Sequence, residues 1–278
     1  MHLRILGPLE VWTAQGERIH VSGVKRRALL ATLVIQTGQA VSIPRLITEL
    51  WGPAPPAGAV NALQAHIVRL RKALSTEPDR LVTHPTGYTL YADTDAKEFT
   101  HLVTAARHSP DPAPQLRKAL SLWRGPALDG CVAGDICAAE ASALEEVRLT
   151  AMETLYEASL RAGHHAEVIA DLTEATTAFP LRERFYAQLM EALCRAGRQA
   201  DALAVYDRAR KRFITELGAE PGPALRARVQ SIKTPAPTGN DLTREVAELQ
   251  HKIDALVTRQ AELLQRLQEQ HPKLSTAH

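Results

Sequence analysis

One helical segment carries polar side chains of the kinds that read the edges of DNA bases. Apolar residues recur at steps of three and four along residues 60–74, which predicts an amphipathic α-helix without any acidic residue. Its buried stripe would comprise Val60, Leu63, Ile67, Leu70 and Leu74. The opposite side carries Asn61, Arg69 and Lys72, flanked by Gln64 and His66. An arginine can donate two hydrogen bonds to guanine, which supplies about 1–3 kcal/mol of base discrimination. The alternative interpretation is a solvated helix face that binds nothing.

A β-hairpin is expected directly after this helix. Two β-like runs, 81–84 and 88–91, are joined by the turn signal Pro-Thr-Gly at 85–87. A basic-faced helix followed by a hairpin is typical of the end of a winged helix-turn-helix, which puts the helix in the major groove and the hairpin, or wing, beside it. The wing residues Thr83, His84 and Thr86 are therefore further candidates for DNA contact.

Other cations in this region are candidates for phosphate contacts, which set register and salt dependence but read no sequence. Arg71 and Lys72 are assigned to phosphate, with an internal ion pair as the alternative for Arg71. Three further cations, Lys25, Arg26 and Arg27, open a helix predicted at 25–36. Cations at that end oppose the helix dipole, so a nearby phosphate would explain them. Plain solubility is the alternative explanation.

The elements that must position these side chains can be placed from local signals. Residues 2–21 alternate loosely and predict short antiparallel strands. Gly38 is placed to end the helix at 25–36. A second helix at 43–51 has Ser42 as a candidate N-cap and Pro44 near its start. The order of strands, three helices and hairpin predicts an N-terminal winged-helix domain at 1–95.

Residues 96–233 are predicted to form a second, all-α domain. The segment RAGHHA at 161–166 returns as RAGRQA at 195–200, an offset of 34 residues. That period is typical of tetratricopeptide helical hairpins, which stack and leave a surface for partners. The fold class is thus mainly α and multidomain, an α+β winged helix followed by tetratricopeptide-like helices.

The C-terminal region predicts a linker at 234–240 and a heptad helix at 241–271. The linker is rich in Pro, Thr and Gly. The expected seam of the helix comprises Leu242, Val246, Leu249, Ile253, Leu256, Gln260, Leu263 and Leu267. Branched residues at position a and leucine at position d favour a parallel two-stranded coiled coil. Val257 and Leu264 widen the apolar face, so packing onto the body of the protein is the alternative.

These motifs, taken in order, resemble the Streptomyces antibiotic regulatory protein family of transcriptional activators. The N-terminal ones are LGPLEV at 6–11, RRALLA at 26–31, ELWG at 49–52, RLRKAL at 69–74 and PTGY at 85–88. The later ones are LWRGPAL at 122–128, PLRE at 180–183, AGRQA at 196–200 and ELGAEP at 216–221. The resemblance implies an OmpR-type winged helix followed by a bacterial transcriptional activation domain.

The resemblance to this family also implies two partners, namely double-stranded DNA bearing direct repeats near biosynthetic promoters and RNA polymerase holoenzyme. The loop of Gly52, Pro53, Pro55 and Pro56 would touch the polymerase, with a rigid connector as the alternative role. Two features depart from the family pattern. His84 and Pro85 stand in the wing where related proteins often have an arginine, and the heptad helix lies outside the two-domain plan.

Bulk properties narrow the class of protein. A net charge of +2 means that any nucleic-acid surface must come from local clustering, and 4% aromatic residues argue against single-strand stacking. Three cysteines at irregular spacing make no disulfide framework. No signal peptide, membrane span, phosphate loop or hydrolase motif is found, so we expect a cytoplasmic non-enzyme with no metal or cofactor. The prediction is a homodimeric DNA-binding activator. The alternatives are a tetratricopeptide-type interaction scaffold and a ligand-sensing regulator.

Overall fold

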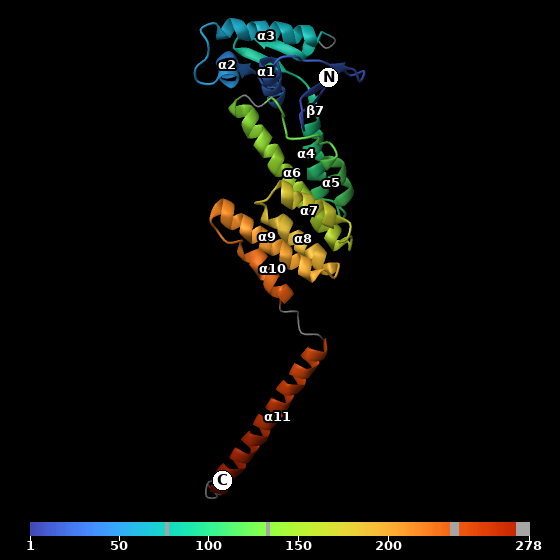
Figure 1. Cartoon of the computed structure of the whole chain (residues 1–278), viewed down its shortest axis with the longest axis vertical. Helices are drawn as coiled ribbons and strands as arrows, with labels where there is room; N and C mark the ends of the chain where they lie inside the picture. The colour runs from blue at the N-terminus through green and yellow to red at the C-terminus, as the bar shows by residue number, and fades with distance from the viewer. Residues whose placement is uncertain (76–77, 132–133, 234–238, 271–278) are drawn as a thin grey trace, which may run out of the picture. The chain divides into compact units, whose positions relative to one another are not determined.

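The N-terminal residues pair into a small sheet that closes on a strand from much later in the chain. The computed structural model describes residues 1–75, 78–131, 134–233 and 239–270, with side chains of the last helix described over 246–264 (Figure 1). Strands β1 (His2–Arg4), β2 (Glu10–Trp12) and β3 (Arg18–Ile19) are antiparallel, and β7 (Asp93–Thr94) runs parallel to β1. The early strands match the prediction, whereas β7 was not anticipated because its pairing partner lies ninety residues away.

The winged helix has the element order expected from the sequence. Helices α1 (Val24–Ile35), α2 (Ile43–Trp51) and α3 (Ala59–Ala73) precede the hairpin of β5 (Leu81–His84) and β6 (Gly87–Leu90), with a short 3-10 turn, η1 (Pro78–Arg80), before β5. The predicted cap is present, since Ser42 accepts a hydrogen bond from the backbone of Arg45 at the start of α2. One strand was missed: β4 (Val41–Ser42) pairs with β6 and makes a three-stranded sheet ordered β4-β6-β5.

Four helices complete the first compact unit, Met1–Phe179: α4 (Asp95–Arg107), α5 (Ala113–Leu120), α6 (Asp135–Arg161) and α7 (Val168–Ala178). The buried carboxylate of Asp95 accepts hydrogen bonds from the backbone of Ile5 at 2.7 Å and Leu6 at 3.3 Å. It also pairs with Arg124 at 3.5 Å. The hydrogen bonds lie within the predicted winged-helix range, whereas the ion pair with Arg124 crosses the boundary expected between residues 95 and 96. The division of the chain into four predicted ranges stays a prediction.

A second tie joins the winged helix to α6. Glu49 of α2 is only 2% exposed, and its Oε2 accepts a hydrogen bond at 3.0 Å from the backbone of Ile136, in the first turn of α6. A carboxylate at this end of a helix satisfies a free N–H group and complements the helix dipole. The hydroxyl of Thr32 on α1 also lies 3.5 Å from the sulfur of Cys137 on α6. The α2 helix is thus fixed to α6 as well as to its own domain.

The second unit, Pro180–His278, contains α8 (Glu183–Arg195), α9 (Gln199–Leu217), α10 (Pro223–Lys233) and α11 (Gly239–Gln270). The turn between α8 and α9 repeats the turn between α6 and α7 at an offset of 34 residues. Gly163 and Gly197 have φ of 86° and 76°, and the following residue donates its N–H to Ser159 in one turn and Leu193 in the other. The sequence repeat is therefore a repeat of helix-ending geometry.

Three general features bear on the class of protein. In the described part of the chain, no helix is long and apolar enough to cross a membrane. Among the same residues, no cluster of three His, Cys, Asp or Glu side chains could hold a metal ion. Cys131, Cys137 and Cys194 are free thiols. Most of the predicted linker at 234–240 and the last residue of the range 241–271 lie outside the described residues.

Candidate nucleic-acid interface

Helix α3 is held by one apolar face and presents the other to solvent. Leu63, Ile67 and Leu70 are almost completely buried and belong to the core shared with α1 and α2. Figure 1 shows α3 along the outer side of the N-terminal unit, with α1 and α2 on its inner side. One predicted stripe residue is wrong: Val60 is 46% exposed, because the helix begins at Ala59 and that alanine takes the buried position.

Four of the predicted α3 contact residues lie on the open side. Asn61, Gln64, Arg69 and Lys72 are all exposed. In the described part of the chain none of the four side chains has a hydrogen-bond or ion-pair partner. These groups are therefore available to an external ligand without breaking an internal contact. A polar face with two cations and two amides is the chemistry that major-groove recognition uses.

His66, the fifth predicted residue of α3, is half-buried and faces α2. Its ring stacks on Trp51 with centroids 6.2 Å apart and an interplanar angle of 29°. Burial lowers the pKa of His66, and the positive charges of Arg69, Arg26 and Lys25 lower it further. Its buried Nδ1 has no hydrogen-bond partner in the described residues. At neutral pH the ring is neutral, so it fills the space between α2 and α3 and adds no charge to the face.

The three cations that open α1 have internal partners or neighbours, which the sequence did not reveal. Lys25 donates to the carbonyl of Leu50 and lies 6.0 Å from the centre of the Trp51 ring. The carbonyl end of α2 thus stabilises this cation, as the helix dipole predicts. Arg26 donates to the hydroxyl of Ser22 at 3.2 Å.

Arg27 lies next to the loop at residues 130–131. Its Nη2 is 3.9 Å from where a Cβ would stand on Gly130, and its positive charge opposes the rise that burial causes in the pKa of Cys131. The side chain therefore lies against this loop, with its buried Nε lacking a hydrogen-bond partner in the described residues, and the DNA phosphate contact of Arg27 stays a prediction. Arg26 makes no such contact, so the phosphate contact expected for it at the start of α1 stays a prediction.

Arg71 contacts the wing through internal hydrogen bonds, and the phosphate contact predicted for it stays a prediction. Its Nη2 donates to the carbonyl of Leu81 at 3.1 Å and to the hydroxyl of Thr83 at 2.5 Å, so it joins the last turn of α3 to β5. The internal role that the sequence left open for Arg71 is the one observed, with hydrogen bonds in place of an ion pair. The hydroxyl of Thr83 is occupied by the same contact.

The tip of the wing is close-packed. Nε2 of His84 lies 2.9 Å from the hydroxyl of Thr89, so this histidine is turned onto its own hairpin. The side chain of Thr86 is exposed, and its carbonyl accepts a hydrogen bond from Ile43 at 3.0 Å. A Cβ on Gly87 would stand 2.0 Å from the carbonyl oxygen of Val41. Only glycine lets the hairpin approach β4 this closely.

The loop between α2 and α3 is exposed at its prolines. Pro53, Pro55 and Pro56 are exposed, whereas Gly52 is half-buried and ends α2 with φ of 73° and an N–H donated to Thr48 at 2.8 Å. Because Glu49 fixes the last turns of α2 to α6, the loop starts from a firmly held point. It can serve as an external contact or as a connector.

The apolar seam of α11 is open to solvent where its side chains are described. Val246, Leu249, Ile253, Leu256 and Leu263 are between 52% and 70% exposed. Gln260 is exposed as well, and the side chains of Leu242 and Leu267 lie outside the described residues. Five large apolar side chains repeating on one face of an exposed helix are unusual unless another surface covers them.

Comparisons with known proteins agree on the kind of protein. A family model described as "Transcriptional regulatory protein, C terminal" matches residues 16–90, and one described as "Bacterial transcriptional activator domain" matches residues 94–233. Transcriptional regulator RedD of Streptomyces coelicolor is 43% identical over 247 residues, which cover 84% of this chain and 70% of RedD. Regulatory protein DnrI of Streptomyces peucetius is 35% identical over 243 residues, 81% of this chain and 89% of DnrI.

A solved structure is similar over most of the chain. The structure titled "Mycobacterium tuberculosis EmbR in complex with low affinity phosphopeptide" has a TM-score of 0.77 and 32% sequence identity. The match covers 91% of this chain and 70% of the EmbR chain. The likeness therefore extends beyond the winged helix into the helices that follow it.

Proposed function

The chain belongs to the Streptomyces antibiotic regulatory protein family of transcriptional activators, and on that premise we propose that it binds DNA through α3 and the wing. The observation that carries the proposal is the exposed side of α3, where Arg69 and Lys72 have no internal partner in the described residues. As a transcriptional regulator it is not an enzyme.

The residues of this face have two different roles in the proposed complex. Arg69, near the middle of the open side, would contact a guanine edge, with Asn61 and Gln64 beside it on other base edges. Lys72 in the last turn would contact phosphate, together with Arg26 at the start of α1. Thr86 is the wing residue whose side chain is exposed and has no hydrogen bond in the described residues. Arg27, Arg71, Thr83 and His84 are left out of the direct contacts because of their internal positions.

Gel-shift titrations of the full chain at two salt concentrations test these roles. Arg69→Ala should weaken binding to cognate DNA by roughly 5- to 150-fold, the equivalent of about 1–3 kcal/mol, and scrambled DNA much less. Lys72→Ala should weaken both DNAs alike and reduce the salt slope by about one. Equal losses on cognate and scrambled DNA for Arg69→Ala would contradict base reading by that residue.

Activation would follow from recruitment of RNA polymerase holoenzyme through the loop of Gly52, Pro53, Pro55 and Pro56. The exposed prolines support this role, since they present a stiff surface next to the DNA-binding helix. The test replaces Pro53 and Pro55 together with alanine and compares in-vitro transcription with DNA affinity. Transcription should fall while DNA affinity stays within about twofold, a difference below 0.5 kcal/mol. A parallel loss of DNA affinity would make the loop a connector.

The target would be direct repeats upstream of a biosynthetic promoter, occupied by two copies of the chain. The open seam of α11 supports a homodimer, and a tether through residues 234–240 would raise the effective concentration of the second DNA-binding unit. Ile253→Asp places a charge in the seam and should give a monomer by mass measurement in solution. His251→Asp, on the outer side of the same helix, is the matched control and should stay dimeric. A dimer that survives removal of residues 241–278 would assign pairing to another part of the chain.

A further inference from the structure

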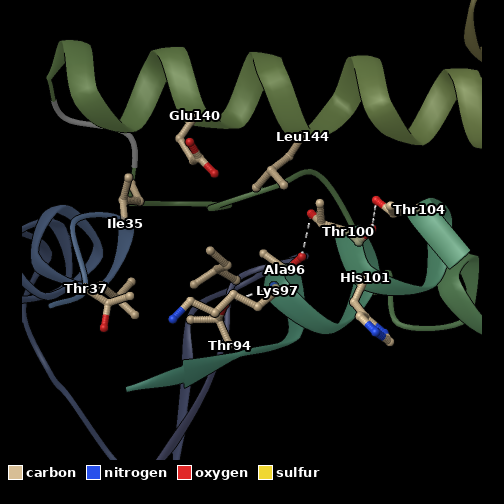
Figure 2. A pocket seen from close by; sticks show the side chains of 12 residues that line it. Ile35, Thr37, Thr94, Ala96, Lys97, Thr100, His101, Thr104, Glu140 and Leu144 are labelled. Carbon is tan, nitrogen blue, oxygen red and sulfur yellow. Dashed lines mark hydrogen bonds between the residues drawn. The ribbon is translucent and has the colours of Figure 1, made fainter. Parts of the chain in front are cut away.

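A cavity in the first unit lies where the winged helix meets the helices that follow it (Figure 2). Its walls come from the end of α1, from α4 and from α6, and its volume is about 380 Å³. The lining is mainly apolar and includes Ile5, Val34, Ile35, Ala96 and Leu144. A cavity of this size and character is within the range of small-molecule sites.

Two opposite charges face this cavity from different helices. Figure 2 shows the carboxylate of Glu140 directed into it from α6, while Lys97 comes from α4 on the other side. Neither side chain has a hydrogen-bond or ion-pair partner in the described part of the chain. Burial raises the pKa of Glu140, which reflects a carboxylate that has lost water without gaining a donor. An ammonium group placed there would supply the missing partner.

Three of the four threonine hydroxyl groups that line the cavity donate to the protein, and the fourth, on Thr94, accepts a hydrogen bond from the backbone of Lys97. Thr100 donates to the carbonyl of Ala96 at 2.9 Å, and Thr104 donates to that of Thr100 at 2.8 Å. Thr37 donates to backbone carbonyls at 3.1 and 3.3 Å. Recognition of charged groups therefore depends on Glu140 and Lys97.

We propose that this cavity binds a small zwitterion, of the class of α-amino acids with an apolar side chain. The ligand ammonium would pair with Glu140, its carboxylate with Lys97, and its side chain would lie on the apolar lining. A ligand with only a positive charge would leave Lys97 opposed to it, and a purely anionic ligand would face Glu140. This site is separate from α3, so its test does not depend on the proposed DNA contacts.

The experiment is isothermal titration and thermal melting of the full chain with L-leucine and L-isoleucine. Two probes each lack one charge: leucinamide has no carboxylate, and N-acetyl-leucine has no ammonium. A free amino acid at ten times its Kd should raise the melting temperature by about 3 °C. Each single-charge probe should bind at least about tenfold more weakly, the least expected from losing one charged hydrogen bond.

Variants assign the response to this cavity. Glu140→Gln and Lys97→Met should each reduce amino-acid affinity by at least about tenfold, with circular dichroism confirming that the variants fold. Glu174→Gln is the matched control, because Glu174 is an exposed carboxylate lining a different cavity, between α6 and α7. An effect of Glu174→Gln in place of Glu140→Gln would overturn the proposal. So would the absence of saturable binding by both amino acids, or equal binding of leucinamide.

Discussion

Replacing Arg71 with alanine should loosen the wing and leave phosphate contacts intact. The side chain makes two hydrogen bonds from α3 to β5, at 3.1 Å to Leu81 and 2.5 Å to Thr83. A net hydrogen bond contributes about 0.5–1.5 kcal/mol, and more when one partner is charged, but solvent reaches both of these bonds and reduces their worth. We therefore expect Arg71→Ala to lower the free energy of unfolding by about 1–2 kcal/mol, or the melting temperature by about 2–8 °C.

The assay combines urea unfolding with gel-shift titration over a range of salt concentrations. Arg71→Ala should lose stability and DNA affinity while keeping the salt slope of the wild type. Lys72→Ala, the neighbouring control, should keep its stability and lose about one unit of slope. The double variant with Thr83→Ala should show a coupling energy of about 0.5–1 kcal/mol between Arg71 and Thr83. Unchanged stability with a reduced slope for Arg71→Ala would refute this reasoning and return Arg71 to the phosphates.

Three further predictions concern stability. Glu49→Ala should lower the free energy of unfolding in urea by about 2–3 kcal/mol, because it leaves the Ile136 N–H without its acceptor. Glu49→Gln should recover part of that loss, and an equal loss for both variants would implicate charge alone. Gly87→Ala should cost about 1–3 kcal/mol, since its Cβ would collide with the Val41 carbonyl, and a neutral effect by the same assay would show that the hairpin can shift. Burial raises the pKa of Glu140 in the fold, so ionisation opposes folding as pH rises through the ordinary carboxyl pKa toward the raised one. Glu140→Gln should therefore be more stable than wild type at pH 7 and lose this advantage in acid. A gain in stability that does not depend on pH would exclude titration of Glu140 as its cause.

Local signals were sufficient for the three helices and the hairpin of the winged helix. The steps of three and four in residues 63–74 identified the buried side of α3, and Ser42 and Pro44 identified the start of α2. The 34-residue repeat located turns whose backbone geometry is the same. Each of these features depends on residues within a few positions of one another, so no knowledge of distant contacts was needed. The prediction for Val60 was wrong because Ala59, the first residue of the helix, takes the buried position.

Contacts between distant residues were beyond the reach of the sequence pattern. Nothing near Asp95 indicates that its carboxylate will bind the backbone of Ile5, and nothing near Glu49 indicates the N-terminus of α6. The two-residue strands β4 and β7 are too short to show an alternation. For the same reason the sequence did not reveal that Arg27 lies beside the loop at residues 130–131.

The cations near α3 show why partners matter more than charge when a binding face is inferred. The sequence offers six cations on α1 and α3, and by type alone they are equivalent candidates. The fold gives Lys25 a helix carbonyl, Arg26 a hydroxyl and Arg71 the wing, so a phosphate would have to compete with those contacts. Arg69 and Lys72 have no such competition in the described residues. Removing an exposed cation that makes no internal contact costs the protein little stability. A change in DNA binding caused by removing either one can therefore be attributed to contact with DNA.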